Sequence, residues 1–87
     1  RQMGRPQWSD LGMFLQTFML LAREAGLDTC PQEAWAIKQE SVTSFVKAPD
    51  ELMLFCGMAI GYKDKNAKIN ELRTERRPFE DWAIFVD

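Results

Sequence analysis

The most constraining feature of this sequence is a long stretch without any charge. Residues 11–22 carry no charged side chain, and their only polar side chains are Gln16 and Thr17. Ser9 before the stretch is typical of a helix N-cap, and Gly26 after it is typical of the position that follows a helix. The pattern predicts a helix over residues 10–25. Because this helix has no polar face, we expect it to be buried on nearly every side.

The chain is too short to bury such a helix by itself. It has 87 residues, 46% of them hydrophobic, which is the size of one small domain at most. We therefore expect residues 1–87 to form a single partial domain, in which another chain or a missing part covers the helix. Twelve uncharged residues are too few to cross a bilayer, which needs about 20, so no membrane partner is expected.

Charge and composition exclude several functions. Eleven Lys and Arg residues against 13 Asp and Glu give a formal net charge of −2, which argues against a nucleic-acid partner. The absence of His removes His-based acid–base catalysis and the commonest metal ligand. Cys30 and Cys56 have no metal-binding spacing and are expected to be buried free thiols in a reducing cytosol. No catalytic side chain and no metal site are predicted, and the expected location is cytoplasmic.

The remaining pattern combines helix and strand. Residues 1–7 are polar and are interpreted as a lead-in. Pro31 suits the first turn of a helix, which predicts a loop that leads into a helix over residues 34–47, with a break near residues 39–41. Residues 52–60 form a continuous apolar run, which favours a central strand buried on both faces.

The apolar tail at residues 82–86 is the only other strand candidate. Because a chain end normally frays, a tail this hydrophobic must dock on something. One buried strand cannot form a sheet alone, so the tail is a second indication of a missing partner.

Four segments occur in an order and spacing that resemble the C-terminal half of the FMN-dependent nitroreductase family. Together they extend over nearly all of residues 8–81. The segments are Trp8–Gly12, Gly26–Gln32, Gly57–Tyr62 and Asn70–Pro78.

The resemblance implies an α+β fold, with a mixed sheet flanked by helices in an intertwined homodimer. In that arrangement the apolar helix would lie in the dimer core, and the tail would pair in trans with the other subunit. It also implies that FMN lies at the dimer interface and that NAD(P)H reduces it. The reduced flavin would then reduce nitroaromatics, quinones or similar acceptors.

The resemblance also implies cofactor-binding residues. The loop Pro31, Gln32, Glu33 and Ala34 would border the flavin ring, with a backbone N–H of Glu33 or Ala34 directed at the flavin. Arg76 would face the FMN phosphate, with Arg73 as a secondary candidate. A lysine found two positions before this arginine in some family members is Thr74 here, so part of that phosphate clamp is missing.

Two functions remain open at this point. The first is a fragment or half-chain of an FMN-dependent oxidoreductase, inactive by itself because the family's N-terminal half is absent from these residues. Its partner would be a second copy or a separate N-terminal half. The alternative is a non-catalytic, truncated dimerisation or interaction module without flavin. The acceptor substrate and the preference for NADH or NADPH cannot be deduced from the sequence.

Overall fold

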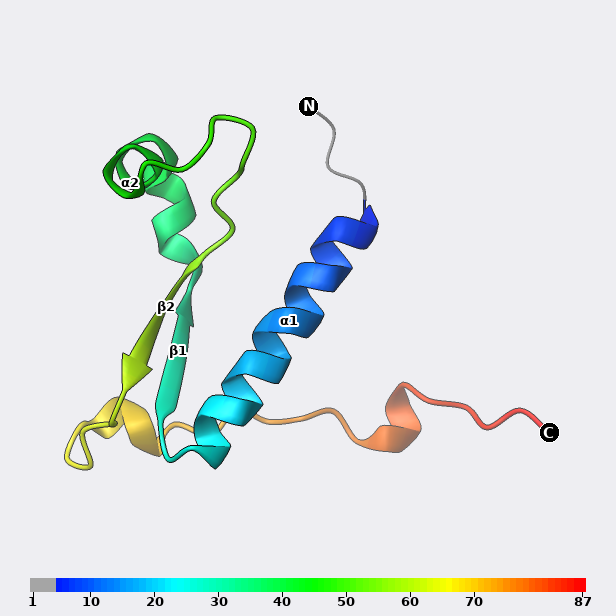
Figure 1. The fold of residues 1–87 in the computed structure, drawn as a ribbon. Coiled ribbons are helices and arrows are strands. Elements are labelled where there is room, and N and C mark those ends of the chain that lie inside the picture. The colour runs from blue at the N-terminus through cyan, green and yellow to red at the C-terminus, as the bar shows by residue number, and fades with distance from the viewer. Residues whose placement is uncertain (1–4) are drawn as a thin grey trace.

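The computed structural model describes residues 5–87, so most of the expected lead-in, residues 1–4, lies outside the described residues. A long helix lies beside two antiparallel strands, β1 and β2, which are called the hairpin below although η1 and α2 lie between them in sequence. Short helices occupy both ends of this strand pair (Figure 1). Residues 72–87 run away from this body. In chain order, the elements are α1 (Arg5–Glu24), β1 (Asp28–Gln32), the 3₁₀ helix η1 (Glu33–Lys38), α2 (Gln39–Val46), β2 (Gly57–Gly61), and the 3₁₀ helices η2 (Lys68–Glu71) and η3 (Phe79–Asp81).

Helix α1 begins earlier than the sequence predicts. It starts at Arg5, so Ser9 lies inside the helix and the expected N-cap at Ser9 is wrong. Pro6 does not prevent the earlier start, because proline is tolerated in the first turn, where its missing N–H would have no partner.

The end of α1 follows the prediction within one residue. Gly26 adopts a positive φ of 84°, which glycine accepts at little steric cost. The N–H of Gly26 donates to the carbonyl of Arg23 (3.0 Å), and the N–H of Leu27 donates to the carbonyl of Ala22 (2.9 Å). This is a Schellman motif, which pairs two of the helix's terminal carbonyls and turns the chain into β1.

The sheet of the described residues is an antiparallel pair of strands. Asp28 lies opposite Gly61 at one end, and Gln32 lies opposite Gly57 at the other. The expected central strand over 52–60, buried on both faces, is wrong: the strand is β2, which is only partly buried and pairs with β1 alone. β1 was not predicted because Pro31 suggested a helix start. Proline is tolerated in an edge strand.

The first half of the apolar run, residues 52–56, has no strand partner, and the side chain of Gln39 bonds to its backbone instead. The carboxamide oxygen of Gln39 accepts the backbone N–H of Leu54 (2.8 Å), and its nitrogen donates to the carbonyl of Leu52 (3.4 Å). The ring of Phe55 lies 5.5 Å from the ring of Trp8 on α1. Residues 52–56 are therefore held to α1 and α2 without forming a strand.

The predicted break near residues 39–41 corresponds to a change of helix type rather than to a gap between helices. The chain is 3₁₀-helical up to Lys38 and α-helical from Gln39. α2 ends at Lys47, which adopts a left-handed conformation with φ of 54° and donates its N–H to the carbonyl of Ser44. This is the conformation in which glycine usually ends a helix.

The chain does not enclose a core. Its radius of gyration is 17.0 Å, whereas a compact chain of this length has about 12 Å. It exposes 8457 Å², compared with about 5,300 Å² for a compact protein of this mass. Ala22 is the single buried hydrophobic residue among those that the structure describes. Roughly 3,000 Å² of surface is thus exposed in excess of a self-contained domain.

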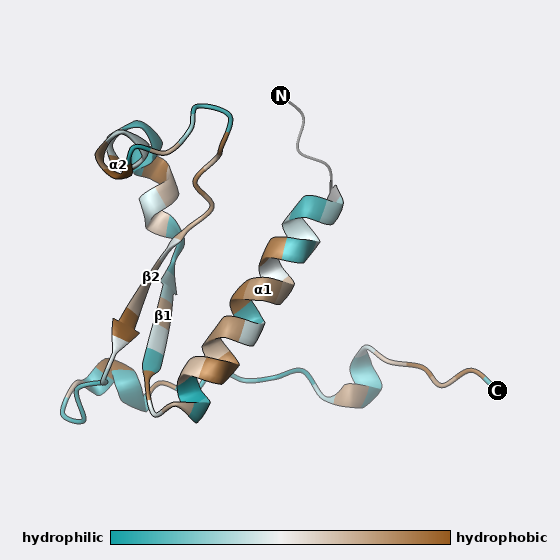
Figure 2. Cartoon of the chain, viewed as in Figure 1, coloured by the Kyte–Doolittle hydropathy of each residue, from teal (hydrophilic) through white to brown (hydrophobic). Residues whose placement is uncertain are grey.

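Large apolar residues of α1 and the tail are among those left exposed. The exposed fraction of the side chain is 64% at Phe14 on α1 and 90% at Ile84 in the tail. Figure 2 shows apolar residues along most of α1 and along the last residues of the chain. This chain alone therefore does not bury the helix, and residues 82–87 form no strand within it.

The tail nevertheless has local order. Phe79 stacks edge-on against Trp82 with ring centroids 4.9 Å apart, and its ring lies 5.7 Å from that of Phe85. These three residues form a small aromatic cluster around η3.

Both cysteines are free, as predicted, but the expected burial is wrong for Cys30, which is exposed, and incomplete for Cys56.

Two glycines provide a matched test of the packing. A Cβ added at Gly57 would lie 2.5 Å from the indole of Trp35, whereas a Cβ at Gly12 on α1 would meet nothing within 4 Å. We expect Gly57→Ala to lower the free energy of unfolding by about 1–3 kcal/mol through overpacking. In residues 1–87 alone, where nothing faces Gly12, Gly12→Ala should raise it by about 0.5–1 kcal/mol through helix propensity. Urea denaturation followed by circular dichroism measures both, and a stabilising Gly57→Ala would contradict this packing.

Candidate functional site

The predicted ring-binding loop lies where β1 ends and η1 begins. Gln32 has an extended backbone (φ −133°, ψ 94°) and makes no side-chain cap to η1. Instead its side-chain oxygen accepts the indole N–H of Trp35 at 2.8 Å. The first amide groups of a helix have no partner within the helix. Because Gln32 does not cap them, the backbone N–H groups of Glu33 and Ala34 are the donors that this loop offers.

An apolar pocket of about 780 Å³ lies beside the loop. The ring of Trp35 packs against Gly57 of β2, where a larger residue would collide with it. Lys38 and Ser41 are among the few polar groups at the pocket wall. The other lining residues are Gln32, Val42, Phe45, Leu54, Met58 and Ala59. The loop thus combines backbone donors with an apolar surface, a combination that suits a flat ring with polar edges.

The two arginines predicted to face a phosphate lie in the segment after η2. Both are exposed. The guanidinium of Arg76 donates through one nitrogen, Nη1, to the hydroxyl of Thr74 and to the carbonyl of Glu75 (3.2 Å). Thr74, at the position of the missing lysine, therefore contacts Arg76 directly. Arginine presents five N–H groups in a fork, so Nη2 and Nε of Arg76, which take no part in these bonds, can still bind an anion.

The structure does not bring the loop and the arginines into one cluster. Residues 31–34 lie at the end of the hairpin that carries η1, and residues 72–77 leave from the end that carries η2 (Figure 1). A ligand that contacted both from the same chain would have to be elongated, with its ring at one end and its anionic group at the other.

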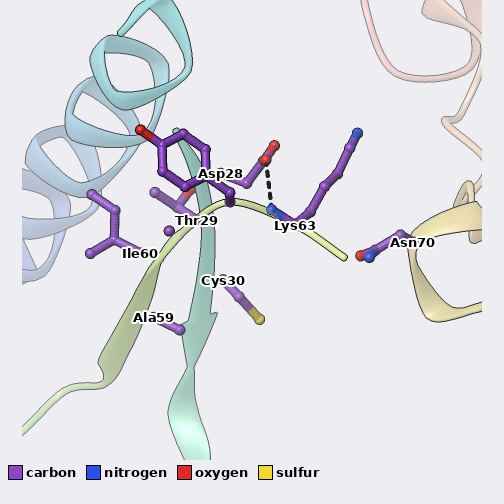
Figure 3. Close-up of a pocket in the computed structure, with 9 residues that line it drawn as sticks. Asp28, Thr29, Cys30, Ala59, Ile60, Lys63 and Asn70 are labelled. Carbon is purple, nitrogen blue, oxygen red and sulfur yellow. Dashed lines mark hydrogen bonds between the residues drawn. The ribbon is translucent and has the colours of Figure 1, made fainter. Parts of the chain in front are cut away.

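Asp28 is a residue that the sequence analysis did not single out. It lines a second pocket, of about 320 Å³, between the hairpin and the residues that follow β2. Its Oδ1 pairs with Arg23 at 2.9 Å, and its Oδ2 accepts the backbone N–H of Lys63 at 3.1 Å. Figure 3 shows this carboxylate directed at Lys63, with Asn70 further along the same side. The signal available in the sequence was a carboxylate just after a helix that ends in an arginine.

Among residues 5–87, no group of three or more potential metal-ligating Cys, Asp or Glu side chains lies close together. No described helix is long and apolar enough to span a membrane.

The comparisons with known proteins agree with one another. Residues 1–62 match the Nitroreductase family. The chain is 43% identical over 79 residues to a 4-nitrobenzoate reductase of Pseudomonas putida, which covers 91% of this chain and 35% of that protein. It is 34% identical over 85 residues to a chloronitrobenzene nitroreductase of Comamonas testosteroni, covering 94% of this chain and 37% of that protein.

A solved structure extends this likeness to the fold. The FMN and NADPH-dependent nitroreductase NfnB from sphigopyxis sp. strain HMH superimposes with a TM-score of 0.90 at 40% identity, covering 98% of this chain and 38% of that one. The chain thus spans little more than a third of the length of the proteins that it matches. The family match extends over most of the chain, and the two-stranded hairpin with its helices is present in the solved relative. This chain belongs to the nitroreductase family.

Proposed function

We propose that the chain is the C-terminal portion of an FMN-dependent NAD(P)H oxidoreductase of the nitroreductase type. In this proposal the complete protein reduces nitroaromatics, quinones or similar acceptors in the cytoplasm. The observation that carries the proposal is the likeness of nearly the whole chain to an enzyme described as FMN and NADPH-dependent. The names of the sequence relatives support a nitroaromatic acceptor.

The residues of the chain fit FMN in chemistry and in placement. FMN carries a flat ring at one end and a phosphate at the other, joined by a flexible chain. The loop over residues 31–34 offers backbone N–H donors next to an apolar wall, and Arg73 and Arg76 offer cations that suit a phosphate. Their separation at opposite ends of the hairpin matches the elongated shape of the cofactor.

Each part of the chain has a defined role in this proposal. Pro31 and Gln32 set the backbone path at the end of β1, so that a backbone N–H of Glu33 or Ala34 donates to the ring. Arg76, with Arg73 beside it, binds the phosphate and orients the cofactor. Bound FMN supplies the redox chemistry, in which NAD(P)H donates a hydride and the acceptor takes up electrons. No side chain of the chain is required as a nucleophile.

The exposed apolar surface supports an obligate partner. If two copies each buried their excess of roughly 3,000 Å², the interface would total about 6,000 Å², at the upper end of obligate interfaces, which bury about 2,000–5,000 Å² or more in total. We propose that a second copy of the chain, or a separate N-terminal half, covers α1. The tail over residues 82–86 would then pair with that partner in trans.

A non-catalytic interaction module is the second candidate. The same exposed apolar surface favours it, because dimerisation alone would cover α1 without any cofactor. Flavin distinguishes the two functions, since the enzyme is yellow as purified and the module is colourless. The absorbance spectrum of the purified full-length protein decides between them.

The first prediction concerns cofactor binding by residues 1–87 alone. A micromolar dissociation constant requires about 8 kcal/mol net, whereas each well-placed charge-assisted contact contributes about 1.5–3 kcal/mol. We therefore expect no FMN binding tighter than about 10 μM by this chain. Quenching of FMN fluorescence on titration measures it. Submicromolar binding would show that these residues already form a complete site.

The second prediction concerns the phosphate contact. In the full-length protein, Arg76→Ala should weaken FMN binding by about 10–100-fold, because a charge-assisted bidentate contact is lost. Arg77→Ala is the matched control, since it removes an equally exposed arginine one residue away and should change affinity by less than about 2-fold. Equal effects of the two substitutions would remove Arg76 from the site.

The third prediction concerns the tail. Each large apolar side chain that is buried contributes about 1.5–3 kcal/mol, so deletion of residues 82–87 should weaken association by at least about 100-fold. Analytical ultracentrifugation measures the dissociation constant, with Glu80→Ala as a control in the polar part of the same segment. A chain that sediments as a monomer at micromolar concentration, with or without the tail, would contradict a docked tail.

A further inference from the structure

The carboxylate of Asp28 joins three parts of the fold. Its Oδ1 accepts from the guanidinium of Arg23 at the end of α1 (2.9 Å), and its Oδ2 accepts the backbone N–H of Lys63 just after β2 (3.1 Å). Asp28 is itself the first residue of β1 and lies opposite Gly61 in the hairpin. Its side chain is 28% exposed, whereas that of Arg23 is 65% exposed.

The chain beyond Lys63 closes on itself. The carboxylate of Asp64 accepts the N–H of Asn66 (2.9 Å), and the carbonyl of Asp64 accepts the side-chain amide of Asn70 (2.7 Å). The N–H of Leu72, at the end of η2, donates to the carbonyl of Ile69 (3.2 Å). Residues 63–72 thus form one internally bonded turn, and Figure 3 shows Asp28 directed at its first residue.

We propose that Asp28 is a positioning residue for the phosphate end of the cofactor site. Arg73 is the first residue after the closed turn, and Arg76 follows within the same segment. By holding the N–H of Lys63, Asp28 fixes the root of the turn and therefore the direction in which the two arginines leave the hairpin. This role rests on the proposed function, in which those arginines bind the FMN phosphate.

The two oxygens of Asp28 can be tested separately. Asp28→Ala removes both the ion pair with Arg23 and the bond to the N–H of Lys63. Asp28→Asn keeps a carbonyl oxygen for the N–H of Lys63 but loses the charge opposite Arg23. Arg23→Gln removes only the ion pair, which is largely exposed and so contributes little. Hydrogen exchange at the Lys63 amide reports its bond to Asp28 directly. Of these three variants, we expect only Asp28→Ala to exchange faster at this amide.

The decisive experiment is a double-mutant cycle in the full-length protein, from which bound flavin is removed before each titration. FMN and riboflavin dissociation constants are measured for Asp28→Ala with the native arginines and with Arg73 and Arg76 both replaced by Ala. With the native arginines, Asp28→Ala should weaken FMN binding by about 3–30-fold, the usual range for coupled residues. Riboflavin lacks the phosphate and so makes no contact with the arginines. Its dissociation constant should therefore change by less than about 2-fold, as expected for independent sites.

The outcomes separate this proposal from the one on which it rests. With both arginines removed, Asp28→Ala should have no further effect on FMN binding. Equal weakening of FMN and riboflavin, or an effect that persists without the arginines, would overturn the positioning role and leave a purely structural one. If removal of the arginines itself leaves FMN affinity unchanged, the phosphate contact fails, and the positioning role fails with it. If only the Asp28→Ala effect is missing, the phosphate contact stands.

Discussion

The structure depends on one constraint: the chain carries more apolar surface than it can bury by itself. A helix with no polar face can be satisfied only from outside, because 87 residues form too few elements to surround it. Helix α1 contacts β1, and Ala22 is the only described hydrophobic side chain that becomes buried. The expanded dimensions and the detached tail follow from the same deficit. The proposal that α1 contributes to a core shared with a partner rests on this deficit.

Within that open framework, polar side chains provide the long-range connections. Gln39 pairs with the backbone of Leu52 and Leu54, and Asp28 pairs with the backbone of Lys63. In each case a side-chain oxygen accepts a backbone N–H that lies outside β2, where the β1–β2 ladder offers it no partner. Such bonds keep backbone groups paired beyond the ends of the sheet. They explain how a hairpin of two strands holds segments that are far apart in the sequence.

The features that local chemistry decides could be predicted from the sequence. Gly26 ended α1 as expected, and the break expected near Gln39 coincides with a change of helix type, because each depends on neighbouring residues alone. β1 could not be predicted, because Pro31 favours a helix start locally and only its pairing with Met58 makes it a strand. The candidate loop and arginines came from the resemblance to the family. Asp28 and Trp35 were missed because their importance depends on contacts with Lys63 and Gly57, which local patterns do not reveal.

The aromatic cluster of the tail has a consequence for how the tail binds. Phe79 holds Trp82 and Phe85 together before any partner is present. A segment that is already partly ordered loses less conformational entropy when it docks than a random coil does. In the proposed assembly the tail would therefore meet its partner as a partly ordered segment, and the shape of the aromatic cluster would contribute to recognition together with its hydrophobicity.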